Sequence, residues 1–214
     1  MKIVLALFLI GTTPFAPMWF LPVHLVAVLL WSAAAILGSP ELVAGRLIKK
    51  AQCGQLKQVP DSPLKHADGS LYMDRWFLLE PSVWTFGIQV RLQCLYSSDA
   101  DRELHDHPSW NISWILRNSY EELIPSLGWE GDPLFMGSRE ELVKKFWRDP
   151  GDVVFRHARY RHRIIVPQGQ AVWTIFVFGP WQRHWGFTTE AGWVWWKHWL
   201  GLEDRSVAPY KDRT

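Results

Sequence analysis

The residues best suited to chemistry in this sequence are two histidines separated by one residue, His105 and His107. On an extended strand, side chains two positions apart share a face, so both imidazoles are expected to lie together while Asp106 points away. Such a pair can bind one metal ion, but imidazole suits iron, zinc, nickel, copper and manganese alike. Two exposed histidines beside a turn would give the same pattern.

A third metal ligand is predicted at His162, at the start of an apolar run. This run follows the turn Pro150-Gly151-Asp152, in which proline fixes φ and glycine is free to adopt a positive φ. His157 is the alternative third ligand, because it lies in the same segment and strand alternation could turn it toward the same interior.

Several charged residues are candidates for supporting roles. A guanidinium binds a carboxylate through two hydrogen bonds, so Arg91 is a candidate for substrate binding, although a solvated strand face explains it equally well. Glu122 is a candidate for orienting a ligand histidine, with a surface charge at a strand end as the alternative. Arg163 follows His162 and is expected on the opposite face, which favours a structural role over substrate contact. Asp101 and Asp106 either orient ligands or cap the turn before the metal strand.

These residues must be positioned by short strands, because after Gly69 the sequence consists of β-branched and aromatic runs broken by turn signals. In the run from Val90 to Leu95, Arg91 and Gln93 fall on one face and the apolar residues on the other. Strands are predicted at 72–79, 84–96, 110–117, 145–147, 152–156, 162–166 and 171–178. The segment 123–143 is expected to be a surface excursion that ends in a short helix at 139–144. Trp76, Trp84, Trp110, Trp114 and Trp173 are predicted core residues.

The His-x-His pair, the Pro150-Gly151-Asp152 turn and the later His162 together resemble the cupin superfamily over residues 72–188. The resemblance implies a mainly β, cupin-type barrel with one metal ion inside. In the cupin pattern a glutamate follows the second histidine and a glycine follows later, and here Asn111 and Asn118 stand at those places. Loss of the carboxylate leaves a three-histidine set similar to that of the thiol dioxygenases, which implies Fe(II), with zinc or manganese as alternatives.

Short motifs also resemble a group of uncharacterised small cupin-like proteins of bacteria and phages. They are Leu104-His105-Asp106-His107-Pro108, Tyr120-Glu121-Glu122, Pro150-Gly151-Asp152, His162-Arg163 and Trp185-Gly186-Phe187. This resemblance supports the fold and the ligands, and it implies no particular reaction.

The N-terminal segment has a different character, because no Asp, Glu, Lys or Arg occurs between Ile3 and Gly38. About 20 such residues suffice to cross a bilayer as a helix. Prolines interrupt the middle of this run, so a membrane-inserted helical hairpin is expected over 1–40, with a cleaved signal peptide and a buried soluble helix as alternatives. A juxtamembrane helix and linker follow at 41–70, the barrel at 71–190 and a Trp-rich tail at 191–214. Basic residues on both flanks of the run place the soluble domain on the cytoplasmic side.

Composition excludes several classes of function. The formal net charge is +2, from 23 basic and 21 acidic residues, which gives no reason to expect a nucleic-acid partner. The two cysteines, Cys53 and Cys94, have no CxxC spacing, so neither a disulfide scaffold nor a zinc ribbon is indicated.

The sequence therefore favours a membrane-anchored Fe(II)-dependent oxygenase that acts on a small or membrane-associated substrate. The first alternative is a non-catalytic module that binds a metal or small molecule at the membrane and docks through the tryptophans at 193–199. The second is isomerase or hydrolase chemistry on zinc or manganese, since the same ligands serve all three metals.

Overall fold

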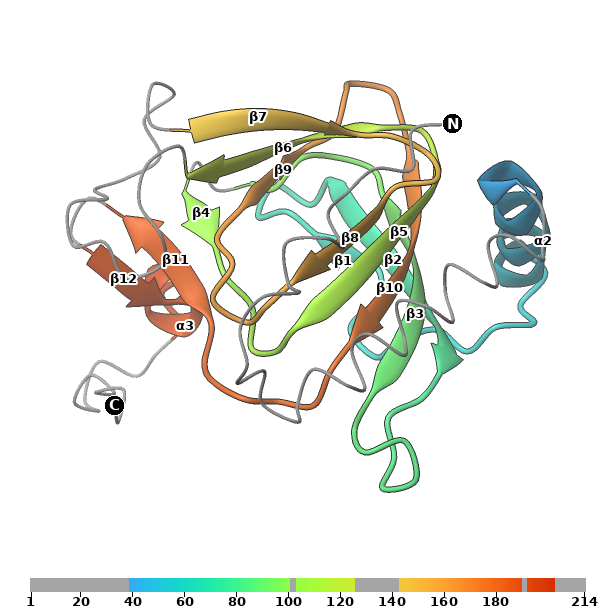
Figure 1. Ribbon diagram of the computed structural model, residues 1–214, viewed down its shortest axis with the longest axis horizontal. Coiled ribbons are helices and arrows are strands. Elements are labelled where there is room, and N and C mark those ends of the chain that lie inside the picture. Colours follow the sequence, from blue (N-terminus) through green and yellow to red (C-terminus); the bar gives the residue numbers. More distant parts are fainter. Residues whose placement is uncertain (1–38, 101–102, 126–142, 190–191, 203–214) are drawn as a thin grey trace, which may run out of the picture.

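The computed structural model describes residues 39–100, 103–125, 143–189 and 192–202, and these form a mainly β structure with a helix against one side (Figure 1). The helices are α2 (Pro40–Gln52) and α3 (Trp196–Trp199). The strands are β1 (Leu64–Lys65), β2 (Leu71–Leu79), β3 (Gln89–Leu95), β4 (Leu104–His105), β5 (Asn111–Arg117), β6 (Tyr120–Pro125), β7 (Val143–Arg148), β8 (Val153–Arg156), β9 (Arg163–Ile165), β10 (Val172–Phe178), β11 (Gly186–Thr189) and β12 (Gly192–Trp195).

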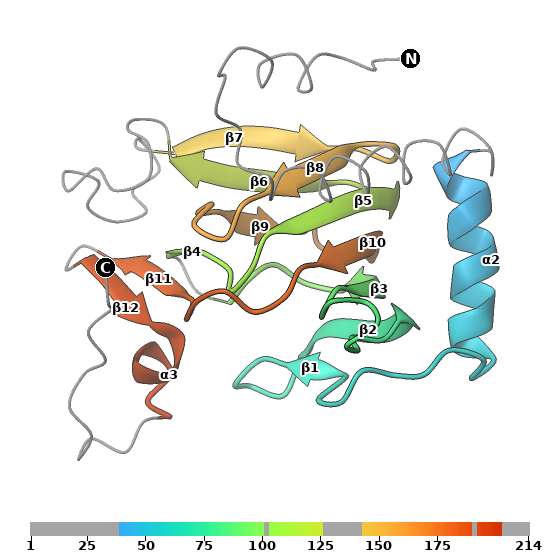
Figure 2. The same cartoon turned by 60° about the horizontal axis from the view of Figure 1, so that its bottom comes forward.

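The described strands form three sheets around an interior. The largest has the order β1-β2-β3-β10-β5-β8, and two three-stranded sheets have the orders β7-β6-β9 and β12-β11-β4. An isolated antiparallel bridge between His105 and His162 links the two smaller sheets. Figure 2 shows β11, β12 and α3 at the opposite end of the molecule from α2. The predicted mainly β fold is confirmed.

Helix α2 covers the outer face of the large sheet. Ser39 caps its N-terminus by accepting from the Leu42 backbone N–H, and Pro40 occupies a first-turn position where no backbone donor is needed. The buried face of the helix, Val43, Ala44, Ile48 and Ala51, packs against Leu92, Cys94, Trp114, Leu116, Trp173 and Ile175. Full burial of one such aliphatic side chain contributes about 1.5–3 kcal/mol.

The alternation predicted in β3 is observed, with its polar face turned inward. Leu92 and Cys94 lie in the cluster beneath α2, whereas Arg91 and Gln93 line a cavity inside the barrel. One apolar core of this sheet therefore lies between sheet and helix. A second apolar cluster lies on the inner face, and the polar groups of the cavity occupy the rest of the interior: Leu95, Ile115, Tyr120, Val154, Val166 and Val172 form that cluster.

Two predicted elements are corrected by the structure. The predicted strand 84–96 begins only at Gln89, because Ser82 and Thr85 exchange hydrogen bonds in a turn, and Phe86 and Gly87 take positive φ angles of 51° and 74°. Trp84 lies in this turn and is 89% exposed, so it is not a core residue. The predicted helix 139–144 is wrong at its described end, because Val143 and Lys144 belong to β7 and pair with β6.

The predicted membrane hairpin lies outside the described residues. Among the residues that the structure does describe, no helix is long and apolar enough to cross a membrane. At the other end of the chain, residues 192–195 of the predicted tail pair with β11, so this part of the tail belongs to the sheet that carries β4.

Candidate metal centre

The three predicted ligand histidines lie together, and the backbone explains why. His105 and His162 face each other across the antiparallel bridge and exchange both backbone hydrogen bonds, at 2.9 and 3.0 Å. Side chains directly opposite in such a pair project to the same face, and His107 joins them two residues after His105. One nitrogen of each ring lies within 4.8 Å of the others.

The arrangement of the nitrogens fits one metal ion. The Nε2 atoms of His107 and His162 are 2.8 Å apart. Two nitrogens that each bind one ion at about 2.0–2.1 Å are separated by about 3 Å, so this spacing is close to that of two ligands of the same ion. His105 completes the set, with its ring centroid 5.2 Å from that of His107 and 4.8 Å from that of His162.

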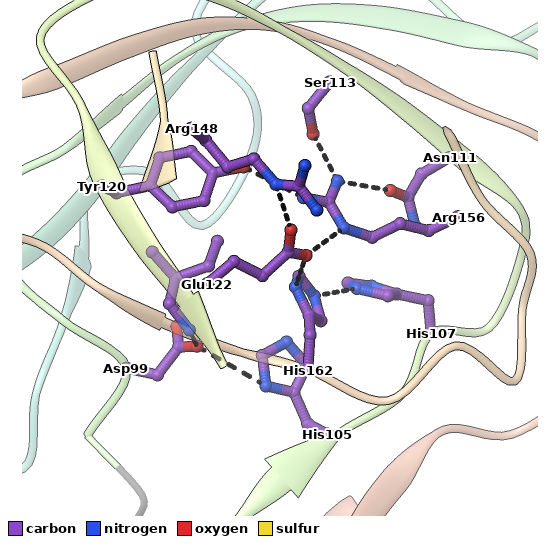
Figure 3. A network of polar contacts seen from close by, with 11 residues as sticks. Asp99, His105, His107, Asn111, Ser113, Tyr120, Glu122, Arg148, Arg156 and His162 are labelled. Atoms are coloured by element: carbon purple, nitrogen blue, oxygen red, sulfur yellow. Dashed lines mark hydrogen bonds and ion pairs between the residues drawn. The ribbon is translucent and has the colours of Figure 1, made fainter. Parts of the chain in front are cut away.

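A buried ionic network lies behind His162 (Figure 3). The Nδ1 of His162 is 2.8 Å from Glu122 Oε1, and the same oxygen accepts a 2.7 Å hydrogen bond from Arg156 Nε. Arg148 donates to the other carboxylate oxygen at 2.6 Å. Because an ionised carboxylate only accepts, the proton of His162 is on Nδ1, which leaves Nε2 as the lone-pair nitrogen that a metal requires.

Arg156 is the hub of this network. Its guanidinium is 1% exposed and also donates to Ser113 Oγ at 2.9 Å and to the hydroxyl of Tyr120 at 3.0 Å. Burial alone would raise the pKa of Glu122, but the charge of Arg156 and the hydrogen bond from His162 outweigh it and hold this pKa well below its usual range. The carboxylate is therefore ionised across the whole physiological pH range.

The same surroundings keep His107 and His162 neutral. Burial, followed by the charge of Arg156, lowers the pKa of His162 to about 4. Burial and the neighbouring imidazoles lower the pKa of His107 well below its ordinary value. Neutral imidazoles are the form that binds metals, so the site is prepared for an ion at neutral pH.

A second carboxylate, Asp99, lies beside His105. Its Oδ2 is 3.6 Å from His105 Nδ1 and accepts a 2.7 Å hydrogen bond from the Ile164 backbone N–H. Its other oxygen accepts from the Tyr72 hydroxyl at 2.5 Å. Asp99 therefore places a carboxylate oxygen beside the Nδ1 of His105, as Glu122 does beside the Nδ1 of His162, but at a longer distance.

Asp106 points away from the histidines and fixes the segment from behind. Its carboxylate accepts from the Gly186 backbone N–H at 2.8 Å and from Trp193 Nε1 at 3.0 Å, and it pairs with Arg183. The backbone N–H of Asp106 also donates to Gly186 O at 3.0 Å. Asp106 thus ties the His-x-His segment to β11 and β12.

The histidines open onto a cavity of about 260 Å³ inside the barrel, and Arg91 lines the same cavity. Arg163 pairs with Leu123 in the β6–β9 ladder and is not among the residues that line this cavity. His157 packs against Tyr160, with ring centroids 5.9 Å apart, and lies outside the three-histidine cluster. Asn111 is fully buried, and its amide oxygen lies 3.5 Å from Arg156 Nη1.

Sequence reasoning missed Arg156 and Asp99. Arg156 ends the predicted strand 152–156 as a charged residue at an inward position, which was a usable signal. Asp99 lies in the acidic stretch before the metal strand, where Asp101 was named instead. Asp101 lies outside the described residues.

No protein-family model and no curated protein matches the chain. Solved structures with similar folds include Fe(II)-HppE with an alternative substrate (TM-score 0.40, 15% identity), the formate complex of Lactobacillus farciminis oxalate decarboxylase (0.41, 14%) and DMSP lyase DddQ from Ruegeria pomeroyi DSS-3 (0.39, 16%). The matches cover 57%, 71% and 60% of this chain, and 59%, 37% and 58% of those proteins. The chain thus spans less than two thirds of each.

The described residues form a mainly β structure that carries a three-histidine cluster suited to a divalent metal ion.

Proposed function

We propose that the protein is a metal-dependent enzyme, an Fe(II) oxygenase that acts on a small substrate inside its barrel. The observation that carries this proposal is the convergence of three imidazoles on one point beside a cavity of about 260 Å³. Three protein ligands leave coordination positions open, which is typical of catalytic rather than structural metal sites. A bound ferrous ion supplies a redox centre with room for oxygen and substrate.

The surrounding residues support this role in two ways. Glu122 orients His162 and Asp99 lies beside His105, so two of the three rings have a carboxylate behind them. Two aromatic rings also lie near the cluster, with the ring centroid of Trp185 6.2 Å from that of His105 and the ring centroid of Phe176 6.5 Å from that of His107. Such apolar neighbours reduce the access of water to a metal site.

Metal analysis of the full chain, purified anaerobically, tests the proposal. We expect about one iron per chain, with oxygen consumption once a substrate is present, and loss of iron in His105→Ala, His107→Ala and His162→Ala. His66→Ala is the control, because His66 bonds to Ser97 outside the cluster. Iron that persists in all three variants would contradict the ligand assignment, and zinc without oxygen uptake would favour hydrolase or isomerase chemistry.

The alternative is a non-catalytic binding module at a membrane. The described C-terminal segment presents Trp199, Leu200 and Leu202 with exposed fractions of 38%, 49% and 64%, which suits docking more than catalysis. A metal-free chain that retains its fold would support this alternative.

We also propose that residues 1–40 anchor the protein in a membrane, with the barrel on the cytoplasmic side. The support is the uncharged run from Ile3 to Gly38 and its basic flanks. Extraction of the membrane fraction with alkaline carbonate tests the anchor, because only an inserted chain stays in the pellet.

A further inference from the structure

Two arginines project into the cavity that holds the histidines. Arg75 on β2 and Arg91 on β3 both line it. In the β2–β3 register Arg75 lies opposite Gln93 and Arg91 lies opposite Phe77, so the two arginines are diagonal neighbours on the inner face. Such neighbours are about 7–8 Å apart at the backbone, within reach of two long side chains.

Among the described residues, neither arginine has a carboxylate within ion-pair distance. Arg91 donates from Nε and Nη2 to a single neutral oxygen, Gln89 Oε1, at 2.9 and 2.5 Å. Arg75 donates from Nη2 to Pro60 O at 3.4 Å, and its buried Nε has no hydrogen-bond partner among the described residues. By contrast, Arg148, Arg156 and Arg183 each pair with a carboxylate.

Without a bound anion, the two neighbouring guanidinium groups raise the free energy of the folded state. Burial, followed by the charge of Arg75, lowers the pKa of Arg91 to about 10. Burial also lowers the pKa of Arg75, against the opposing charge of Asp61. Two like charges held in a half-buried space, with no carboxylate of the described segments in ion-pair range, raise the free energy of the folded state. An anion between them would lower it.

Neutral polar groups complete the same wall. Thr174 on β10 lies opposite Gln93 on β3, which places Arg75, Gln93 and Thr174 in one row across three strands. Thr174 is 2% exposed, lines the cavity, and its hydroxyl has no partner among the described residues. A buried hydroxyl without a partner beside two unpaired guanidinium groups forms a set of donors for an oxyanion.

The row adjoins the metal centre. Phe176 lies opposite Arg91 in the β3–β10 register, and its ring is 6.5 Å from the His107 ring. One aromatic side chain thus separates the arginine from the histidine cluster. The cavity of about 260 Å³ restricts the occupant to a small molecule.

We infer that Arg75 and Arg91, with Thr174, bind the oxyanion head of a small substrate whose other end reaches the three histidines. The head is a carboxylate, a phosphonate or a phosphate, which share the acceptor geometry that guanidinium groups match. The placement of the other end at a metal rests on the proposed function, whereas anion binding itself requires no metal.

Calorimetric titration of the full, chelator-treated chain with inorganic phosphate and, separately, with acetate tests this inference. We expect saturable binding of at least one anion and an affinity loss of about ten-fold or more in Arg75→Met and Arg91→Met, since each removes a charge-assisted hydrogen bond. Arg163→Met is the matched control, a half-buried arginine outside the cavity lining, and should bind as the unaltered chain does. The preferred anion identifies the head group.

Stability separates a binding role from a structural one. Removal of one of two repelling charges should leave the thermal midpoint unchanged or raise it, and phosphate or acetate should raise the midpoint of the unaltered chain more than that of either variant. Absence of saturable binding of both anions, or equal binding by all variants, would overturn the inference. Anion binding by a chain that takes up no iron when iron is supplied would retain the anion site and refute the oxygenase. Iron uptake by a chain that binds neither anion would retain the metal centre and refute the anion site.

Discussion

The Glu122 carboxylate connects the metal centre to the framework of the barrel. One oxygen is shared by His162 and Arg156, and the other accepts from Arg148. Glu122 is 0% exposed and Arg156 is 1% exposed, so neither charge has water to compensate for a lost partner. The orientation of a ligand and the stability of the fold thus depend on the same side chain.

Glu122→Gln should therefore destabilise the protein strongly. Loss of the carboxylate leaves Arg156 buried and uncompensated, which costs about 3–5 kcal/mol in comparable pairs. Urea denaturation measures the change, with Glu80→Gln as control, because the Lys57–Glu80 pair is exposed and contributes less than about 1 kcal/mol. Equal losses in the two variants would show that the buried network is not a stabilising unit.

The stability of the metal-free protein should fall with acidification. In the folded chain the pKa of His162 is lowered to about 4 from an ordinary value of 6.5. Between these values the unfolded chain binds a proton that the folded chain excludes, so the free energy of unfolding decreases as the pH falls, by on the order of 3 kcal/mol at the lower limit. Denaturation of the chelator-treated chain at about pH 7 and about pH 5 measures this, and His162→Gln should show a shallower decrease. A slope that is unaltered in the variant would assign the effect elsewhere.

At the residue scale, the sequence predicted the histidines better than their environment. Period-two alternation is a local property, so it placed His105 and His107 on one face. The partners of Arg156 come from β5 and β6, and no local pattern contains that information. The inward direction of Arg91 was equally hidden, because alternation separates two faces without stating which one is covered by a helix.

At the scale of elements, β11 and β12 support β4, the strand that carries His105. Gly186 begins β11, and an added Cβ there would lie 2.1 Å from Val194 O and 2.9 Å from the Trp193 ring. The absence of a side chain at Gly186 is what allows the two strands to approach, and its backbone N–H donates to Asp106.

Gly186→Ala should consequently reduce stability by about 2 kcal/mol or more, because the strands must separate to admit the methyl group. Gly45→Ala is the control, and it should increase stability. Nothing lies within 4 Å of an added Cβ at this position in α2, and alanine stabilises a helix relative to glycine by about 0.5–1 kcal/mol. Thermal denaturation followed by circular dichroism measures both, and a neutral Gly186→Ala would mean that β12 does not pack against β11.

The sequence predicted the backbone conformation of one turn correctly. Gly151 takes a φ of 101°, as the Pro150-Gly151-Asp152 turn predicted. Asn118, at the place of the cupin glycine, has a φ of 58°, a left-handed conformation that asparagine tolerates better than most residues. The short strands β4, β11 and β12 were missed because runs of two to four residues are too brief to show a period.

At the scale of the whole molecule, the apolar side chains of the turn before β3 extend into solvent. Val83, Trp84 and Phe86 are 83%, 89% and 82% exposed. The combined change Trp84→Ser and Phe86→Asn should alter the free energy of unfolding by less than about 0.5 kcal/mol, since neither side chain is packed. Light scattering should show less self-association of the variant. A large stability loss would mean that the turn packs against the barrel in solution.

The mainly β class of the domain was predictable because strand length and turn spacing agreed with each other along the chain. The sequence did not predict which polar side chains face the interior of the barrel. A net charge of +2 gives no hint that Arg75, Arg91 and Arg156 all face one cavity, because composition does not record direction. The apolar layer beneath α2 contributes to this, because it buries part of the hydrophobic core outside the barrel interior.

The partners of Asp106 have a consequence for biosynthesis. Gly186, Arg183 and Trp193 all leave the ribosome long after the histidines that they brace. During translation the His-x-His segment therefore emerges before the partners of the Asp106 carboxylate have been synthesised. These contacts can fix the segment only after the later residues have left the ribosome. After a protease cut between β10 and β11, only noncovalent contacts would hold β11 and β12 against the His-x-His segment, although the cut itself lies outside the histidine cluster.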